Sequence, residues 1–130
     1  MVSLKLFILL HTLLMKHSFL KSVTCSLNGI RHVLKTERNF KIQVLCGISI
    51  LLLGFEAKLS KTEWCILFLT VGFVLCMELV NTCIEKTMDL IHPEYSEKVK
   101  VIKDIAAGVV TLASLVAVAV GILLFYNLFI

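Results

Sequence analysis

The chain has 130 residues, of which 58% are hydrophobic and 17% are charged, and its mean hydropathy is +0.95. Soluble domains are usually about 45–50% apolar, so this composition argues against an ordinary soluble domain and favours a single membrane domain. The net charge is only +4, and the basic residues cluster beside apolar segments, so we expect no nucleic-acid partner. The five cysteines form no Cys-x-x-Cys pair, and we expect them to act as small hydrophobic side chains.

Residues 1–15, MVSLKLFILLHTLLM, combine one lysine with a short apolar core. A signal peptide has this pattern, but no small-residue cleavage site follows it here. The alternative is an unstructured or membrane-touching extension, upstream of a true start at Met15. We therefore expect residues 1–15 to be an extension and residues 16–130 to form the membrane-embedded domain.

An amphipathic pattern extends from about Lys16 to Phe40. It sets an apolar stripe (Phe19, Leu20, Val23, Leu27, Ile30, Leu34) against a polar, mostly basic face (Lys21, Asn28, Arg31, Lys35, Arg38). Such a helix typically lies in the membrane interface. Glu37 is the exception, because it continues the apolar stripe; it could snorkel, pair with Lys41, or face the interior of a helix bundle.

Three long apolar segments follow, and each is predicted to cross the membrane as a helix. They cover residues 42–57, residues 64–84 after a polar turn at 58–63, and residues 105–130 after a polar connection at 86–104. In the third segment Ala113, Ala117 and Gly121 recur every four residues, a pattern typical of close packing between membrane helices. The expected fold class is an all-α membrane protein with an N-terminal interfacial helix and three transmembrane helices.

The basic residues predict the orientation of these segments. Seven of them lie in residues 1–41, two in residues 58–63 and four in residues 86–104. Cytoplasmic segments carry the excess of lysine and arginine, so the N-terminal helix and the 86–104 connection should lie in the cytoplasm. Five charged residues would then share the membrane face that meets nucleotides: Glu37, Glu85, Asp89, Lys103 and Asp104.

A ladder of polar side chains marks the second apolar segment. Glu78, Asn81, Glu85 and Asp89 are spaced i, i+3, i+7 and i+11, so they share an arc of roughly 80° on one helix face. Glu78 falls within the apolar segment, where a carboxylate costs about 2.5–3.5 kcal/mol on insertion scales. Such residues usually face a bundle interior or a wet cavity, so this ladder, which we call the acidic face, predicts a site.

The chemistry of these groups suits a divalent cation and a polyphosphate. Mg²⁺ is typically held by one or two carboxylates together with substrate phosphates, and Glu37 and Glu85 could supply the carboxylates. Lys103 could balance phosphate charge. Glu78 is deeper and partly desolvated, which suits a general base acting on a lipid hydroxyl. No Gly-rich phosphate loop of the Walker type is present.

Two other readings stay open on the residues alone. A small transporter or exporter subunit would use one intramembrane glutamate for cation and substrate, which explains Glu78 but not the acids gathered at the cytoplasmic edge. A purely structural membrane subunit explains the small-residue stripe but leaves the acidic face without a purpose. The residues favour an enzyme without determining its reaction.

Several motifs carry a resemblance to a known family. They are ELVNTCIEKTMD at 78–89, HPEY at 92–95, KVIKDIAAGVV at 100–110, and upstream GI at 29–30 and ERNFKI at 37–42. In order and spacing they resemble the prokaryotic diacylglycerol kinase and undecaprenol kinase family over about residues 16–125. The resemblance implies a lipid kinase that uses ATP and Mg²⁺ to phosphorylate a lipid alcohol in the bacterial inner membrane. It also implies a homotrimer with active sites between subunits.

The resemblance also implies individual roles. Glu78 would be the catalytic base, and Glu37 and Glu85 would hold Mg²⁺ against ATP. The nucleotide would be contacted by Lys103 and Asp104 and bordered by Glu94, Tyr95 and Ser96. The site would be ordered by Asn81 and Asp89. Two positions depart from the family pattern, since Cys83 replaces a usual Ala and Ser96 a common His. The ERNF and HPEY wording is more similar to the undecaprenol kinase branch, so a polyprenol is the favoured lipid.

Overall fold

The structure is a computed structural model that describes residues 2–126, with side chains described from Phe19 onward. These residues form four helices: α1 (Val2–Thr36), α2 (Arg38–Glu56), α3 (Lys61–Ile91) and α4 (Glu97–Phe125). They fall into two compact units, which divide between Thr36 and Glu37. The all-α fold class is therefore confirmed, whereas the predicted domain boundary after residue 15 stays a prediction.

The first unit consists of α1, which is one helix through most of the amphipathic segment and ends at Thr36, four residues before the predicted end. Its apolar stripe is exposed, as at Phe19 (68%) and Leu27 (60%). The hydroxyl groups of Thr24 and Ser26 donate to the backbone carbonyls four residues earlier, each at 2.9 Å. An exposed apolar stripe is what a helix in the membrane interface would bury in lipid. The interfacial location of α1 stays a prediction.

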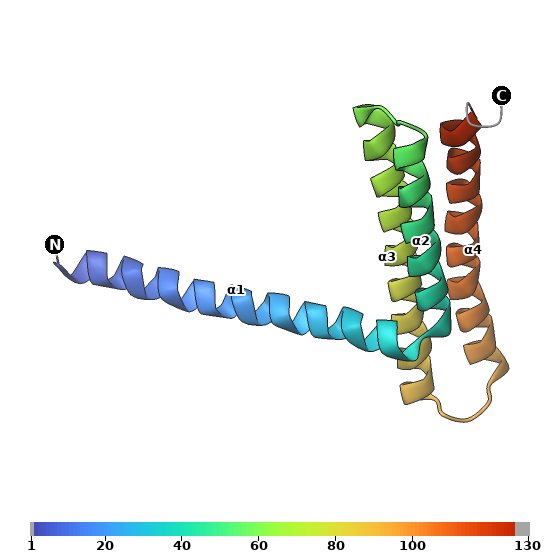
Figure 1. Cartoon of the computed structure of the whole chain (residues 1–130). Helices are drawn as coiled ribbons and strands as arrows, with labels where there is room; N and C mark the ends of the chain where they lie inside the picture. The colour runs from blue at the N-terminus through green and yellow to red at the C-terminus, as the bar shows by residue number, and fades with distance from the viewer. Residues whose placement is uncertain (1, 127–130) are drawn as a thin grey trace. The chain divides into compact units, whose positions relative to one another are not determined.

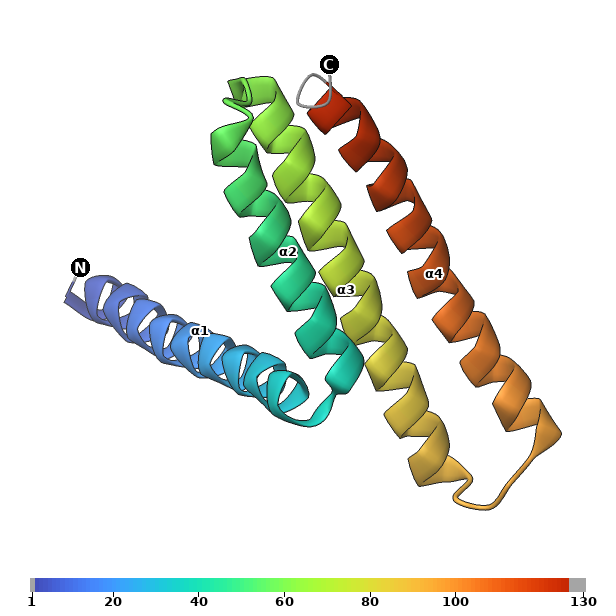
Figure 2. The same cartoon turned by 45° about the vertical axis from the view of Figure 1, so that its right-hand side comes forward.

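In the second unit α3 packs against both α2 and α4, and the three helices run side by side (Figure 1). The start of α2, the end of α3 and the start of α4 lie at the same end of this unit, and a second view agrees (Figure 2). The connection between α3 and α4 covers only residues 92–96. The polar residues that the sequence places around positions 37, 85 and 103 are therefore brought to one end.

Two glycines allow α2 and α3 to approach closely. Gly47 and Gly54 are buried and lie two helical turns apart on α2. A Cβ atom on Gly47 would lie 2.9 Å from Cγ1 of Val71, and one on Gly54 would lie 3.0 Å from Cη2 of Trp64. Small residues at these positions let the two helix backbones pack closely, as is common between membrane helices.

The turn between α2 and α3 is fixed by local hydrogen bonds. Ser60 caps α3 in a capping box: its Oγ accepts from the backbone N–H of Glu63, while Oε2 of Glu63 accepts from the backbone N–H of Ser60 at 2.7 Å. Lys58 adopts a left-handed backbone conformation with φ of 53°, which reverses the chain after α2. The capping box starts α3 at Lys61, three residues before the predicted second span.

Three helices, α2, α3 and α4, are long and apolar enough to cross a membrane, which confirms the three predicted spans. Few residues of their apolar windows are buried inside the unit, between 17% and 28%. Large side chains such as Leu69 and Leu123 point outward, at 74% and 77% exposure. Surfaces this apolar require lipid or other protein around them.

The helix boundaries differ from the apolar segments. α3 continues to Ile91 and α4 begins at Glu97, because helical hydrogen bonding continues into the aqueous end after the apolar pattern stops. The last predicted residues of the third span, 127–130, lie outside the described residues. The break between α1 and α2 falls at Glu37. Glu37 is thus not a member of the α1 stripe, and Phe40 belongs to α2.

Candidate active site

The acidic face of α3 passes from a buried end to an exposed one. Glu78 is 4% exposed, and Asn81 and the neighbouring Thr82 are 6% and 4% exposed. One and two turns further along, Glu85 is half-buried and Asp89 is exposed. The acidic face therefore passes from buried to exposed side chains along α3, and its relation to the membrane surface stays a prediction.

Asn81 and Glu85 form the first polar contact within this face. The side-chain N–H of Asn81 donates to Oε1 of Glu85 at 2.9 Å. The other polar atom of Asn81, Oδ1, is buried and has no hydrogen-bond partner within the described residues. A buried acceptor without a donor is uncommon, so this oxygen is a candidate contact for a bound group.

Glu37 reaches the site from the start of α2. It is the N-cap residue of α2, with extended backbone angles (φ −94°, ψ 120°). Glu37 therefore lies at the break between α1 and α2. Its Oε1 lies 2.7 Å from Nζ of Lys86 on α3. Glu37 therefore forms an ion pair to another helix, and its side chain is only 28% exposed. This contact agrees with the alternative in which Glu37 faces the helix bundle.

Two other carboxylates influence Glu78. Besides the desolvation that its burial causes, Glu78 feels the charges of Glu85 and Glu37. Glu85 is two turns further along the same helix, and Glu37 is the N-cap residue of α2. This clustering of like charges is a frequent feature of functional sites.

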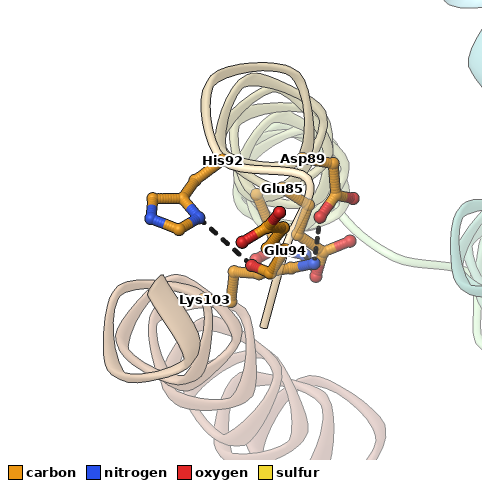
Figure 3. A network of polar contacts seen from close by, with 6 residues as sticks. Glu85, Asp89, His92, Glu94 and Lys103 are labelled. Carbon is orange, nitrogen blue, oxygen red and sulfur yellow. Dashed lines mark hydrogen bonds and ion pairs between the residues drawn. The ribbon is translucent and has the colours of Figure 1, made fainter. Parts of the chain in front are cut away.

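α4 contributes Lys103 to the same end of the bundle. Its Nζ donates to Oδ1 of Asp89 at 2.8 Å, and the charge of Glu85 also acts on it. Figure 3 shows Lys103 extending from α4 toward Asp89 and Glu85 on α3. Lys103 thus lies beside the acidic face, as the sequence predicted, and it ties α4 to the end of α3.

The connection between α3 and α4 is more exposed. Nδ1 of His92 contacts the backbone oxygen of Glu94 at 3.2 Å (Figure 3). The Tyr95 hydroxyl, on a side chain that is 80% exposed, donates to Oε2 of Glu97 at 2.7 Å. This hydrogen bond raises the pKa of the Tyr95 phenol, and desolvation and the charge of Asp104 act in the same direction.

Within the described residues, three predicted site residues make no hydrogen bond or ion pair with the acidic face. The side chain of Tyr95 pairs with Glu97, the side chain of Ser96 makes no capping bond at the start of α4, and Asp104 is exposed. Their predicted contact with a nucleotide stays a prediction. An exposed connection of this kind is accessible to a ligand from the aqueous phase.

The oxygen-rich donor set fits Mg²⁺. Hard cations take carboxylate and amide oxygens, and the site offers the carboxylates of Glu37 and Glu85 and the unpaired Oδ1 of Asn81. Among the described residues no group of three or more His, Cys, Asp or Glu could hold a metal alone. A pair of carboxylates matches the way Mg²⁺ is bound together with substrate phosphates.

The sequence did not predict the role of Lys86 as the partner of Glu37. Lys86 follows Glu85 directly, but at about 100° per residue it lies off the acidic face. Its contact depends on where α2 begins, and no proline or glycine marks the break at Thr36, Glu37 and Arg38. The one feature of the sequence that could have indicated this contact is that Lys86 directly follows Glu85, a predicted metal ligand.

Fold and site together define a class of protein: an all-α, multi-pass membrane protein with a carboxylate cluster at one end of its helices and a lysine beside it. The family model described as "Prokaryotic diacylglycerol kinase" matches residues 24–125. The chain therefore belongs to the prokaryotic diacylglycerol kinase family and is a membrane lipid kinase. Membership implies ATP as the nucleotide and a lipid as the acceptor.

Two relatives place the chain within this family. It is 38% identical over 107 residues to the undecaprenol kinase of Bacillus subtilis (strain 168), covering 82% of this chain and 87% of that protein. It is 36% identical over 94 residues to the diacylglycerol kinase of Synechocystis sp. (strain ATCC 27184 / PCC 6803 / Kazusa), covering 72% of this chain and 54% of that protein.

Proposed function

We propose that this chain transfers the γ-phosphoryl group of ATP to the hydroxyl group of undecaprenol, in preference to diacylglycerol. The greater coverage of the undecaprenol kinase relative supports this choice, because the match spans 87% of that protein and 54% of the diacylglycerol kinase. The observation that carries the reaction type is the burial of Glu78 next to Glu85 and Glu37.

Glu78 is the general base in this proposal. The lipid hydroxyl enters from the membrane, and the Glu78 carboxylate takes its proton as the oxygen attacks the γ-phosphorus. The new O–P bond forms while the bond from the γ-phosphorus to the ADP oxygen breaks, which leaves lipid phosphate and ADP. The proton ends on Glu78 and leaves to water afterwards. Positioned bases contribute about 10²–10⁴-fold to such steps.

Glu37 and Glu85 would hold Mg²⁺, which neutralises developing charge on the phosphates when it is bound. Asn81 orients Glu85 through its hydrogen bond. Lys103 balances the charge of the nucleotide from α4, and Asp89 positions Lys103 through their ion pair. Glu94, Tyr95, Ser96 and Asp104 would border the nucleotide on the aqueous side.

The proposed location is the inner membrane of a bacterium, with the site on the cytoplasmic face. The distribution of lysine and arginine supports this orientation. We also propose a homotrimer. An apolar groove of about 580 Å³ between α2, α3 and α4 supports it, because Ala117 and Gly121 of the small-residue stripe line the groove and let a neighbouring helix approach closely.

The direct test is to incubate the purified protein in phosphatidylcholine vesicles with γ-labelled ATP and Mg²⁺, supplying undecaprenol and diacylglycerol in separate reactions. The proposal expects label in both lipids or in undecaprenol alone, with the higher kcat/KM for undecaprenol, and no label after chelation of Mg²⁺. Preference for diacylglycerol would refute the choice of lipid. A transporter subunit would label neither lipid.

A further inference from the structure

Lys86 is a charged residue at the site to which the proposed reaction gives no role. Its Nζ lies 2.7 Å from Oε1 of Glu37, so the ion pair joins α3 to the first residue of the second unit. Glu37 is the acid that acts on Lys86 most strongly, and the charges of Asp89 and Glu85 act on it as well. Lys86 therefore lies within the electrostatic field of the proposed metal ligands.

The two partners differ in how free they are to move. The side chain of Glu37 is 28% exposed, whereas that of Lys86 is 51% exposed. A lysine ammonium on a four-carbon stem reaches water by rotation of its side chain, so leaving Glu37 requires no change in the helices. Glu37 is the half-buried partner and stays at the site.

We infer that Lys86 is a displaceable counter-ion of Glu37. It holds the Glu37 carboxylate at the site while no metal is bound, and it yields that carboxylate to the cation when the metal and nucleotide bind. This inference rests on the proposed function, because it takes Glu37 as a metal ligand. An ammonium and a divalent cation compete for the same carboxylate charge, and the divalent cation interacts more strongly.

Removing the lysine charge should therefore strengthen metal binding. In Lys86→Gln the cation meets Glu37 without a competing ammonium, and the Mg²⁺ concentration at half-saturation should fall by about two- to fivefold, the size typical of exposed ion pairs. The same variant should be less stable than the unsubstituted protein in EDTA, because the ion pair between Lys86 and Glu37 is lost there and no cation replaces it. A residue with a purely structural role would weaken both properties.

The experiment measures thermal unfolding of the full chain in phosphatidylcholine nanodiscs. Melting temperatures are recorded across a Mg²⁺ titration with a saturating non-hydrolysable ATP analogue, and separately in EDTA. Lys86→Arg keeps the charge and should behave like the unsubstituted protein. Lys100→Gln removes an exposed lysine that lies 4.0 Å from Glu97 instead, so it controls for net charge and should leave the Mg²⁺ midpoint unchanged.

A lower Mg²⁺ midpoint for Lys86→Gln alone supports the inference. An unchanged or higher midpoint overturns it, while lipid phosphorylation by the unsubstituted protein would leave the proposed function intact. Equal shifts in Lys86→Gln and Lys100→Gln would also overturn it, because they would reflect net charge. If the unsubstituted protein showed neither Mg²⁺-dependent stabilisation nor lipid phosphorylation, the proposed function would fail and this inference with it.

Discussion

The side-chain amide of Asn81 donates a hydrogen bond to Oε1 of Glu85 at 2.9 Å, one helical turn further along α3. The amide itself is buried, so it fixes the direction of a carboxylate that is partly open to solvent. The contact joins the interior of the bundle to the group that we propose as a metal ligand.

Replacing Asn81 should loosen that ligand. Hydrogen bonds to charged groups contribute about 1.5–3 kcal/mol, so Asn81→Ala should raise the KM for ATP by about tenfold or more. Steady-state kinetics at saturating lipid measure the effect. Cys83→Ala, on the same helix but with an exposed side chain, is the matched control and should keep the original KM. Equal KM values in both variants would contradict a role for Asn81.

The ion pair between Lys103 and Asp89 should matter more for the nucleotide than for folding. Because the Asp89 side chain is 64% exposed, Asp89→Asn should change the melting temperature little. It should nevertheless raise the KM for ATP, since Lys103 loses its positioning partner.

Lys103→Met should raise the KM for ATP further, by about tenfold or more, because a charge-assisted contact to phosphate is lost. Binding of a fluorescent ATP analogue to the two variants would compare them directly. If Asp89→Asn bound the analogue more weakly than Lys103→Met, the assignment of Lys103 as the nucleotide contact and Asp89 as its positioning partner would be wrong.

The close approach of α2 and α3 predicts a difference between two glycine substitutions. Gly47→Ala places a Cβ 2.9 Å from Cγ1 of Val71, whereas Gly72→Ala meets nothing within 4 Å. Overpacking typically costs about 1–3 kcal/mol, so Gly47→Ala should be less stable than Gly72→Ala by that amount. Reversible unfolding in mixed detergent micelles measures both. Equal unfolding stability of the two variants would contradict the prediction, because it would show that α2 and α3 can move apart at Gly47 without a cost in stability.

Much of the site could be predicted because α3 is a regular helix. The spacing of Glu78, Asn81, Glu85 and Asp89 fixes their common face wherever the helix lies, and the apolar run before Glu78 predicts its burial. The three spans could be predicted because the length and hydropathy of an apolar segment indicate a membrane-crossing helix. Lys103 was placed at the correct end by the orientation of the spans, although its partner Asp89 was not predicted.

The parts that sequence reasoning missed depend on contacts between helices. Glu37 was placed on the stripe of the N-terminal helix because its spacing continues that stripe, and the alternative that it faces the helix bundle was left open. Its pairing with Lys86 depends on the break at residue 37, which no proline or glycine marks. The spacing of the acidic face already extended the helix through Asp89, beyond the apolar pattern, but its end at Ile91 was not predicted. The end of α3 and the break at residue 37 are boundaries that periodicity does not mark.

The central claim is that Glu78 deprotonates the lipid hydroxyl. The most direct measurement compares Glu78→Gln with the unsubstituted protein in vesicles that contain undecaprenol, recording phosphoryl transfer from labelled ATP and binding of an ATP analogue. The account predicts that kcat falls by about 10²-fold or more while the affinity for the analogue stays within about twofold. Retention of more than a tenth of the original kcat would contradict the assignment of Glu78 as the base.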